Sequence, residues 1–111
     1  MQELLDKTRS LSAEFAESGL YLDYLKCKEA LLADAEVLRR VRDYKTVQMS
    51  FEAKRLNGGQ VSFDEEKRVA GLYTELSLNP VAGAYLAAEY AMLKLYEAAF
   101  DALNDACDIS L

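Results

Sequence analysis

The sequence has no histidine and no tryptophan among its 111 residues, and it has only one proline and five glycines. Without histidine, the chain lacks the usual general base near neutral pH and the commonest metal ligand. So few prolines and glycines disfavour a turn-rich β fold and favour long helices joined by short connections. These absences argue against most acid–base and metal-dependent enzymes and favour an all-α protein.

Basic residues are also in deficit, because the formal net charge is −6 at pH 7. Nucleic-acid affinity depends mainly on lysine and arginine replacing phosphate counterions, so we expect no direct DNA binding. The two cysteines, Cys27 and Cys107, have no CxxC spacing, and the starting residues MQELLDKTRS lack the apolar run of a secretion signal. We therefore predict a cytoplasmic protein with reduced thiols, in which both cysteines act as small buried apolar side chains.

The sequence does contain the apolar periodicity of helices. Apolar residues make up 51% of the chain and charged residues 29%, which is typical of a globular protein. The length fits one domain, residues 1–111. We predict an all-α fold, an antiparallel bundle of four to five helices with a long C-terminal helix, and a dimer. The expected helices are residues 2–17, a second after Ser18, a third over residues 34–56, a fourth from Ser62 to about Leu78, and a last one after Asn79.

Polar residues mark the expected helix starts. Ser18, Ser62 and Asn79 each precede an apolar-periodic segment, and Pro80 takes the first position of the last helix. Ser62 and Glu65 match a capping box, in which the serine accepts from the third helical amide and the glutamate reaches back. These signals predict where three of the helices begin.

The boundary between the second and third helices stays open. Asp34 could cap a new helix, but the segment LLADAEV contains no breaker, so one continuous helix is also compatible with the pattern. The third helix is expected to end at Asn57-Gly58-Gly59, because glycine adopts the left-handed C-cap geometry without steric penalty.

The last helix carries two neighbouring apolar seams with heptad spacing. The bulky seam contains Ala82, Leu86, Glu89, Leu93, Tyr96, Phe100, Leu103 and Cys107. The alanine-rich seam contains Val81, Tyr85, Ala88, Met92, Leu95, Ala99, Ala102 and Ala106. Membrane insertion is not expected, because Glu89, Lys94, Glu97 and Asp101 interrupt this segment and each would cost roughly 2–3 kcal/mol at a bilayer centre.

One small domain cannot easily cover both seams along a helix of about 40 Å. We therefore predict that one seam packs inside the protomer and the other meets a partner, most simply a second copy. The alternative is that the remaining helices wrap this helix completely within a monomer. The interface candidates are Tyr85, Leu86, Met92, Leu93, Tyr96, Phe100 and Leu103.

Acidic residues in the last helix suggest no catalytic or metal site. Glu89 lies on the bulky seam, and we expect it either to bend to the edge of the seam or to pair with an arginine, a lysine or a tyrosine hydroxyl, rather than to act as a functional acid. Asp101, Asp105 and Asp108 have no glycine-containing loop to support a cation site, so we interpret them as a solvated face.

Residues 34–56 form the one segment with a basic surplus, +2 against −8 for the rest of the chain. A partner-docking stripe for an acidic protein or for RNA phosphates is conceivable there, consisting of Arg39, Arg42 and Lys45. Ion pairs with acidic helices are the commoner explanation for such a surplus.

The order of elements resembles the YlbF/YmcA family of small bacterial proteins, which includes the YheA-like members. The likeness is carried by YLDYLKCKEALLADAEVLRRVRDY, by a helix that ends in Gly-Gly, and by LYTELSLNPVAGAYLAAEYAML. The resemblance implies an all-helical, commonly dimeric fold with no recognised enzyme activity. It also implies a link to competence, biofilm formation and sporulation, through relatives that assist the endoribonuclease RNase Y in processing messenger RNA.

This chain departs from those relatives in its cysteines. The relatives hold iron–sulfur clusters through cysteines grouped near their C-termini, whereas this chain has only Cys107 there and Cys27 far away. Four thiolates are the usual requirement for a cluster. We expect no cofactor, and a cluster shared across a dimer is the alternative.

The leading hypothesis is a non-enzymatic cytosolic regulator or adaptor that self-associates through its last helix and binds a protein partner, such as a related family member or RNase Y. The rival hypotheses are direct RNA contact through the stripe at Arg39, Arg42 and Lys45, and metal or cluster carriage through Cys107.

Overall fold

A computed structural model describes residues 1–107, and these residues form five α-helices without a strand. The all-α prediction is therefore confirmed. Asp108, one of the acids considered above, lies outside the described residues. The helices are α1 (Gln2–Ala16), α2 (Gly19–Leu32), α3 (Ala35–Leu56), α4 (Phe63–Ser77) and α5 (Pro80–Ala106).

Four of the helices begin with a side-chain cap, in which a short polar residue accepts a hydrogen bond from an otherwise unpaired backbone amide. The three expected caps are confirmed, at Ser18, Ser62 and Asn79. Asp34 settles the open boundary, because its carboxylate accepts from the amide of Val37 at 3.2 Å and α3 starts as a separate helix. Gly58 at the end of α3 has a φ of 76°, which confirms the left-handed C-cap.

One half of the predicted capping box is wrong. The hydroxyl of Ser62 does accept from the amide of Glu65 at 3.1 Å. The carboxylate of Glu65, however, accepts from the ammonium of Lys54 at 2.9 Å instead of reaching back to the Ser62 amide. The ammonium is a charged donor from the neighbouring helix, and hydrogen bonds between ionised groups are stronger than those to a neutral amide.

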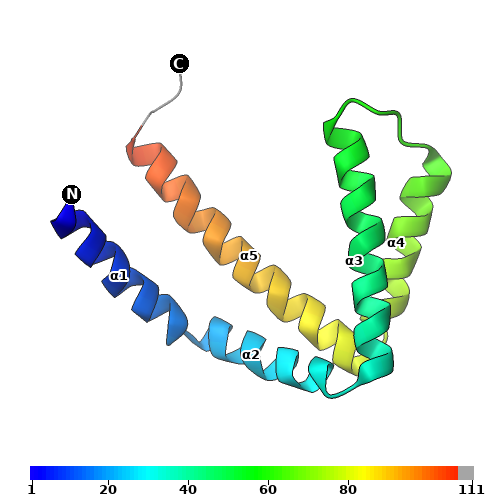
Figure 1. The fold of residues 1–111 in the computed structure, drawn as a ribbon, viewed down its shortest axis with the longest axis horizontal. Helices are drawn as coiled ribbons and strands as arrows, with labels where there is room; N and C mark the ends of the chain where they lie inside the picture. Colours follow the sequence, from blue (N-terminus) through cyan, green and yellow to red (C-terminus); the bar gives the residue numbers. More distant parts are fainter. Residues whose placement is uncertain (108–111) are drawn as a thin grey trace.

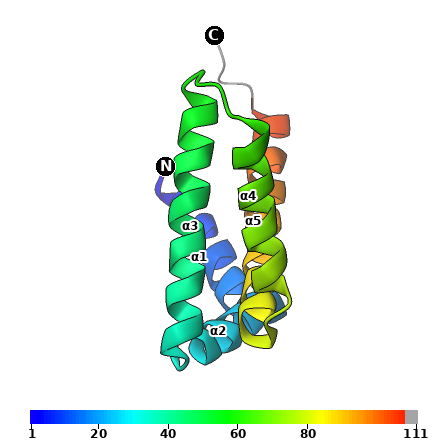
Figure 2. The same ribbon diagram turned by 90° about the vertical axis from the view of Figure 1, so that its right-hand side faces the viewer.

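The five helices form a flat V (Figure 1). One arm contains α1, α2 and α5, and the other arm is the antiparallel hairpin of α3 and α4, seen face on in Figure 2. The molecule measures 48 × 39 × 17 Å along its principal axes. Its radius of gyration is 17.6 Å, whereas a compact domain of this length has about 13 Å. The chain thus spreads its surface more widely than a compact bundle would.

The core lies at the apex of the V, where α2, α3, α4 and α5 meet. Its buried members are Leu31, Val37, Val41, Tyr44, Leu76, Ala82, Tyr85 and Leu86. Ala82 is fully buried, which lets the start of α5 approach the neighbouring helices closely. Beyond the apex the arms bury little, and α1 has no buried residue at all.

A tight connection between α4 and α5 requires glycine at position 83. A Cβ atom built on Gly83 would lie 2.6 Å from the carbonyl oxygen of Ser77, whereas a Cβ on Gly71 in α4 meets nothing within 4 Å. Helix propensity alone predicts that either Gly→Ala change stabilises the protein by about 1 kcal/mol.

We expect the two glycines to respond with opposite signs. Gly71→Ala should raise the free energy of unfolding by about 0.5–1 kcal/mol. Gly83→Ala should lower it by about 1 kcal/mol, because the backbone clash costs more than the propensity gain. Urea denaturation followed by circular dichroism measures both, and stabilisation by Gly83→Ala would contradict the close approach of α4 to α5.

Candidate functional site

A polar network joins the two arms of the V just above the core. The ammonium of Lys45 on α3 donates to both carboxylate oxygens of Glu89 on α5, at 2.6 and 2.8 Å. The hydroxyl of Tyr85 donates to Glu89 at 2.9 Å, and the hydroxyl oxygens of Tyr85 and Tyr24 lie 3.5 Å apart. The predicted pairing of Glu89 with a lysine or a tyrosine is confirmed, and the network explains why an acid is tolerated on an apolar seam.

Burial raises the pKa of the Tyr85 hydroxyl above its usual value of 10, and the hydrogen bonds to Tyr24 and Glu89 raise it further. A raised pKa means that the folded state holds this proton more tightly than the unfolded state does. The resulting stabilisation is complete below pH 10 and is lost as the pH rises above 10.

We predict that Tyr85→Phe weakens the pH dependence of the free energy of unfolding above about pH 10. The wild-type protein should lose stability as the pH rises above about 10, and the variant should lose less because it has no proton to release at this position. At pH 7 the variant should be less stable by about 1 kcal/mol, the worth of a typical hydrogen bond. Thermal melts across this pH range measure both effects. Tyr90→Phe is the control, because Tyr90 is exposed, and an identical alkaline slope for all three proteins would contradict the assignment.

Next to this network lies a tyrosine-rich pocket of about 420 Å³ between the arms. Its lining residues are Tyr21, Tyr24, Lys45, Glu89, Met92, Leu93 and Tyr96. Tyrosine provides rigid contact area with a polar tip, which suits half-exposed packing and interfaces. The pocket continues toward α1 through a second hollow of about 220 Å³ that Phe15, Tyr21 and Tyr96 help to line.

The two seams of α5 have different environments. The alanine-rich seam turns toward α2, with Tyr85, Ala88 and Met92 buried inside the protomer. The bulky seam is buried only near the apex, at Ala82 and Leu86. Beyond Glu89 it is open to solvent, and its exposed members are Leu93, Tyr96, Phe100 and Leu103. The remaining helices therefore do not wrap α5 completely, and four of the seven interface candidates stay uncovered.

The basic stripe of α3 is largely occupied by ion pairs. Arg39 pairs with Glu36 at 2.7 Å and with Asp43 at 2.9 Å, both on the same helix. Lys45 is held by Glu89. Arg42 forms no ion pair within residues 1–107. The structure thus leaves one of the three candidate docking residues without an ionic partner.

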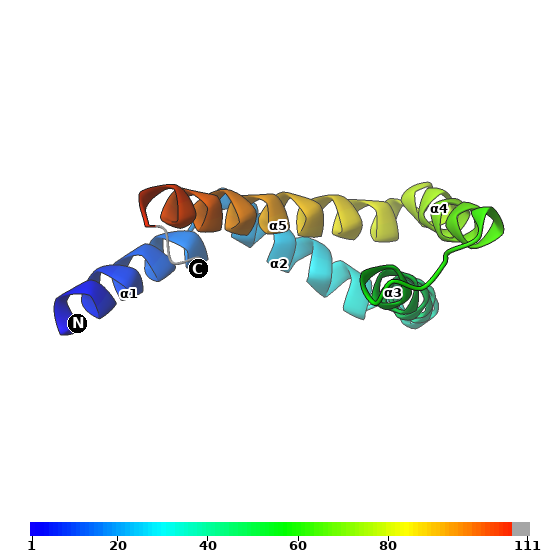
Figure 3. The same cartoon turned by 90° about the horizontal axis from the view of Figure 1, so that it is seen from above.

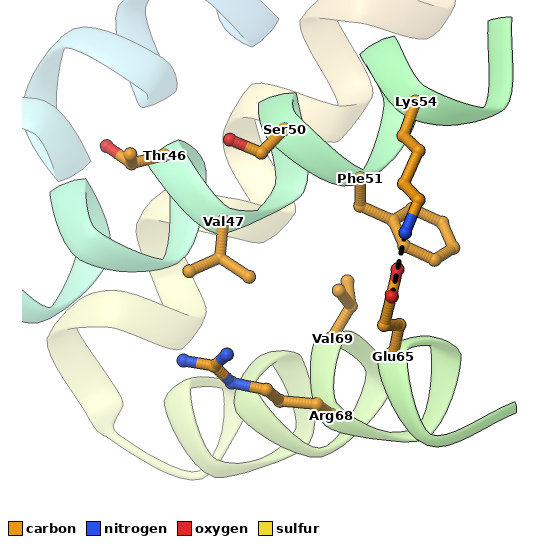
Figure 4. Close-up of a pocket in the computed structure, with 8 residues that line it drawn as sticks. All are labelled: Thr46, Val47, Ser50, Phe51, Lys54, Glu65, Arg68 and Val69. Carbon is orange, nitrogen blue, oxygen red and sulfur yellow. Dashed lines mark hydrogen bonds and ion pairs between the residues drawn. The ribbon is translucent and has the colours of Figure 1, made fainter. Parts of the chain in front are cut away.

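A groove on the outer side of the hairpin was not predicted from the sequence. It has a volume of about 430 Å³, and Figure 4 shows Val47, Phe51 and Val69 between α3 and α4, with the Lys54–Glu65 pair across one end. It adjoins a hollow of about 200 Å³ nearer the apex, and the two share Val47 and Arg68. Taken together, the groove and the hollow are lined by three basic and three acidic residues, so they indicate no charged partner: Arg40, Lys54 and Arg68, and Asp43, Glu65 and Glu75. The sequence feature that could have predicted this groove is the apolar stripe of α3, which continues beyond the core.

The cysteines lie in different environments. Cys27 is half-buried and packs against the apical core, as predicted, but Cys107 is exposed at the end of α5, so the prediction that both are buried is wrong for Cys107. Within the described part of the chain, residues 101–107 are all exposed. Both thiols are free, and no group of three or more Cys, Asp or Glu side chains in the described part of the chain is placed to hold a metal ion.

These features define a small all-helical protein with a polar network between its two arms and an exposed apolar seam along α5. In the region from residue 1 to 107, no helix combines the length and the hydropathy that a membrane span requires. The chain belongs to the YlbF/YmcA family: the family model described as control of competence regulator ComK, YlbF/YmcA, matches residues 4–107.

Curated relatives agree with this assignment. A UPF0342 protein of Caldicellulosiruptor bescii is 30% identical over 95 residues, which cover 86% of this chain and 80% of that protein. A UPF0342 protein of Caldicellulosiruptor saccharolyticus is 28% identical over 109 residues, or 98% of this chain and 91% of that protein. Another, from Desulfitobacterium hafniense, is 28% identical over 92 residues, or 83% of this chain and 74% of that protein. No solved structure gives a significant match.

Proposed function

We propose that this chain is a non-enzymatic cytosolic regulator that self-associates and acts by binding a protein partner. The observation that carries the proposal is the amount of surface the protomer leaves uncovered. The protomer exposes 8613 Å², whereas a compact protein of 12.4 kDa exposes about 6,100 Å². The excess of about 2,500 Å² is more than the roughly 800 Å² per partner that a standard interface needs.

The character of this surface supports association rather than catalysis. Large apolar side chains are exposed along α1, α2 and the C-terminal half of α5, and soluble monomers rarely leave such continuous apolar surface open. Family membership supports a regulatory role, since the family is described by its control of a competence regulator.

Self-association is tested by light scattering after size-exclusion chromatography over a range from about 1 to 200 µM, because dimer formation depends on concentration. We expect a mass of twice the 12.4 kDa chain at the higher concentrations. A mass of one chain at every concentration would remove the main support for the proposal.

For the partner, the family resemblance suggests RNase Y or a related family member, in a role connected with competence, biofilm formation or sporulation. Purified RNase Y, without its membrane anchor, can be titrated with the labelled chain and followed by fluorescence anisotropy. Saturable binding is expected, and an unrelated acidic helical protein is the control. The absence of binding, with or without related family members added, would eliminate this partner.

A further inference from the structure

All seven tyrosines of the chain lie around the ion pair between Lys45 and Glu89. Both residues of the pair line the tyrosine-rich pocket of about 420 Å³, and both also line an adjoining hollow of about 210 Å³. The tyrosines are Tyr21, Tyr24 and Tyr96 in the pocket, Tyr44, Tyr73 and Tyr90 in the hollow, and Tyr85, which bonds to Glu89. The ion pair is thus bordered by three aromatic rings in each cavity.

The walls of the tyrosine-rich pocket suit a flat ring. Tyr21 and Tyr24 come from α2, with ring centroids 6.3 Å apart and 25° between the ring planes, and Tyr96 comes from α5. Figure 3 shows α4 and α5 along one side of the molecule and α3 on the other with the end of α2, so an occupant of the pocket contacts both sides. The volume lies within the range of small-molecule sites, about 300–1,000 Å³. Tyrosine walls favour a planar aromatic ligand, because every base has a face that stacks on an aromatic ring.

The ion pair has hydrogen-bonding capacity left for a ligand. The ammonium of Lys45 has three N–H donors, and its contacts with the two oxygens of Glu89 use at most two of them. A carboxylate offers about four acceptor positions, of which Lys45 and Tyr85 occupy three, so one remains on Oε1. Both side chains are partly open to solvent, at 34% and 23%. Because Nζ and Oε1 are 2.6 Å apart, the pair presents a donor and an acceptor side by side.

The pocket has no spare cation for a phosphate group. Within residues 1–107, Lys45 is the one basic residue among those that line the pocket, and Glu89 neutralises it. Phosphate is held mainly by lysine and arginine, and the whole chain has a net charge of −6. The pocket is therefore matched to an uncharged ligand.

We propose that the tyrosine-rich pocket binds a purine or pyrimidine base, presented as an uncharged nucleoside. The base lies against the tyrosine rings, and its edge accepts a hydrogen bond from the Lys45 ammonium and donates one to the Glu89 carboxylate. Proteins that hold a single base combine aromatic stacking with hydrogen bonds to the base edge in this way. The inference goes beyond the proposed function, which needs only a protein partner, and it does not rest on self-association.

The three methionines of the chain provide a direct test in the full-length protein. Met92 lines the pocket, whereas Met1 and Met49 do not and are 95% and 72% exposed. Protein labelled with carbon-13 in the methionine methyl groups is titrated with inosine, adenosine and uridine and followed by NMR. The ring current of a stacked base should move the Met92 signal saturably, with a dissociation constant below about 1 mM for at least one nucleoside. The signals of Met1 and Met49 should stay in place. A Met92 signal that is unchanged at about 5 mM of each nucleoside would overturn the proposal.

Matched ligands test the two parts of the recognition. Methylation removes the edge donor and keeps the ring in 1-methylinosine, N6,N6-dimethyladenosine and 3-methyluridine, so each should bind about 10-fold or more weakly than its parent. The 5′-monophosphate of the tightest nucleoside should also bind more weakly, because the pocket has no free cation. Equal binding of parent and methylated analogue would reject the hydrogen-bonded edge, and tighter binding of the monophosphate would reject an uncharged ligand.

Two substitutions on α5 provide the matched protein variants. Tyr96 lines the tyrosine-rich pocket and Tyr90 lines only the smaller hollow, and the two are 51% and 59% exposed. Tyr96→Ala should weaken nucleoside binding about 10-fold through the loss of one stacking ring. Tyr90→Ala should change it less than about 2-fold. Tyr21→Ala on α2 should behave like Tyr96→Ala, and circular dichroism checks that each variant keeps its helices. Equal effects at positions 90 and 96 would place the base outside this pocket and reject the proposal.

Discussion

We expect Met92→Asp to unfold the protein, whereas the same change at the neighbouring position, Leu93→Asp, should leave it helical. No other two adjacent positions are expected to differ so much in the stability lost on substitution by aspartate. The side chain of Met92 is 5% exposed and faces the interior of the protomer, whereas that of Leu93 is 56% exposed on the bulky seam of α5. A carboxylate at position 92 would be buried without a partner, and core truncation alone costs about 2–5 kcal/mol. Because the total stability of a small domain is about 5–15 kcal/mol, little folded Met92→Asp protein should remain at 37 °C.

Leu93→Asp places the same charge one position further along the same helix. It loses no core packing, so its far-ultraviolet circular dichroism at 25 °C should match that of the wild type, while its dimer should dissociate. Circular dichroism with chemical denaturation, together with sedimentation, measures both outcomes. Equal loss of helix in the two variants would contradict the division of α5 into a core-facing seam and an uncovered seam.

The second large effect concerns the ion pair between the arms. Lys45→Met removes the ammonium that holds Glu89 and leaves the carboxylate with the Tyr85 hydroxyl alone. Removing one partner of a fully buried pair costs about 3–5 kcal/mol, but the side chains of Lys45 and Glu89 are 34% and 23% exposed. Solvent screening therefore lowers the expected loss of unfolding free energy to about 1–2 kcal/mol.

A second substitution in the same pair provides the matched control. In the double variant Lys45→Met and Glu89→Leu, no charge is left without its partner, so more than half of the lost stability should return. Urea denaturation of the wild type, both single variants and the double variant gives the coupling free energy between the two residues. If the double variant lost as much stability as the two single variants together, the coupling free energy would be zero and the pair would not hold the arms together.

Local signals in the sequence were enough for the helices and most of their ends. Ser18, Ser62 and Asn79 cap helices because a short polar side chain reaches its own backbone amides whatever the rest of the chain does. Gly58 ends α3 for an equally local reason. Where a distant group competes, the local pattern fails: Glu65 was expected to complete a capping box, but Lys54 from the neighbouring helix takes its carboxylate.

The sequence by itself determined the all-α class, the two seams of α5 and the need for Glu89 to find a partner, because these follow from residue types and spacings within single helices. Only the tertiary structure decided that Lys45, 44 positions away, is that partner. The tertiary structure likewise decided which seam of α5 stays buried beyond the apex, and that no residue of α1 is buried. Periodicity assigns residues to a face of a helix, but the turns between helices set the angle between the two arms, and that angle determines which face another helix covers.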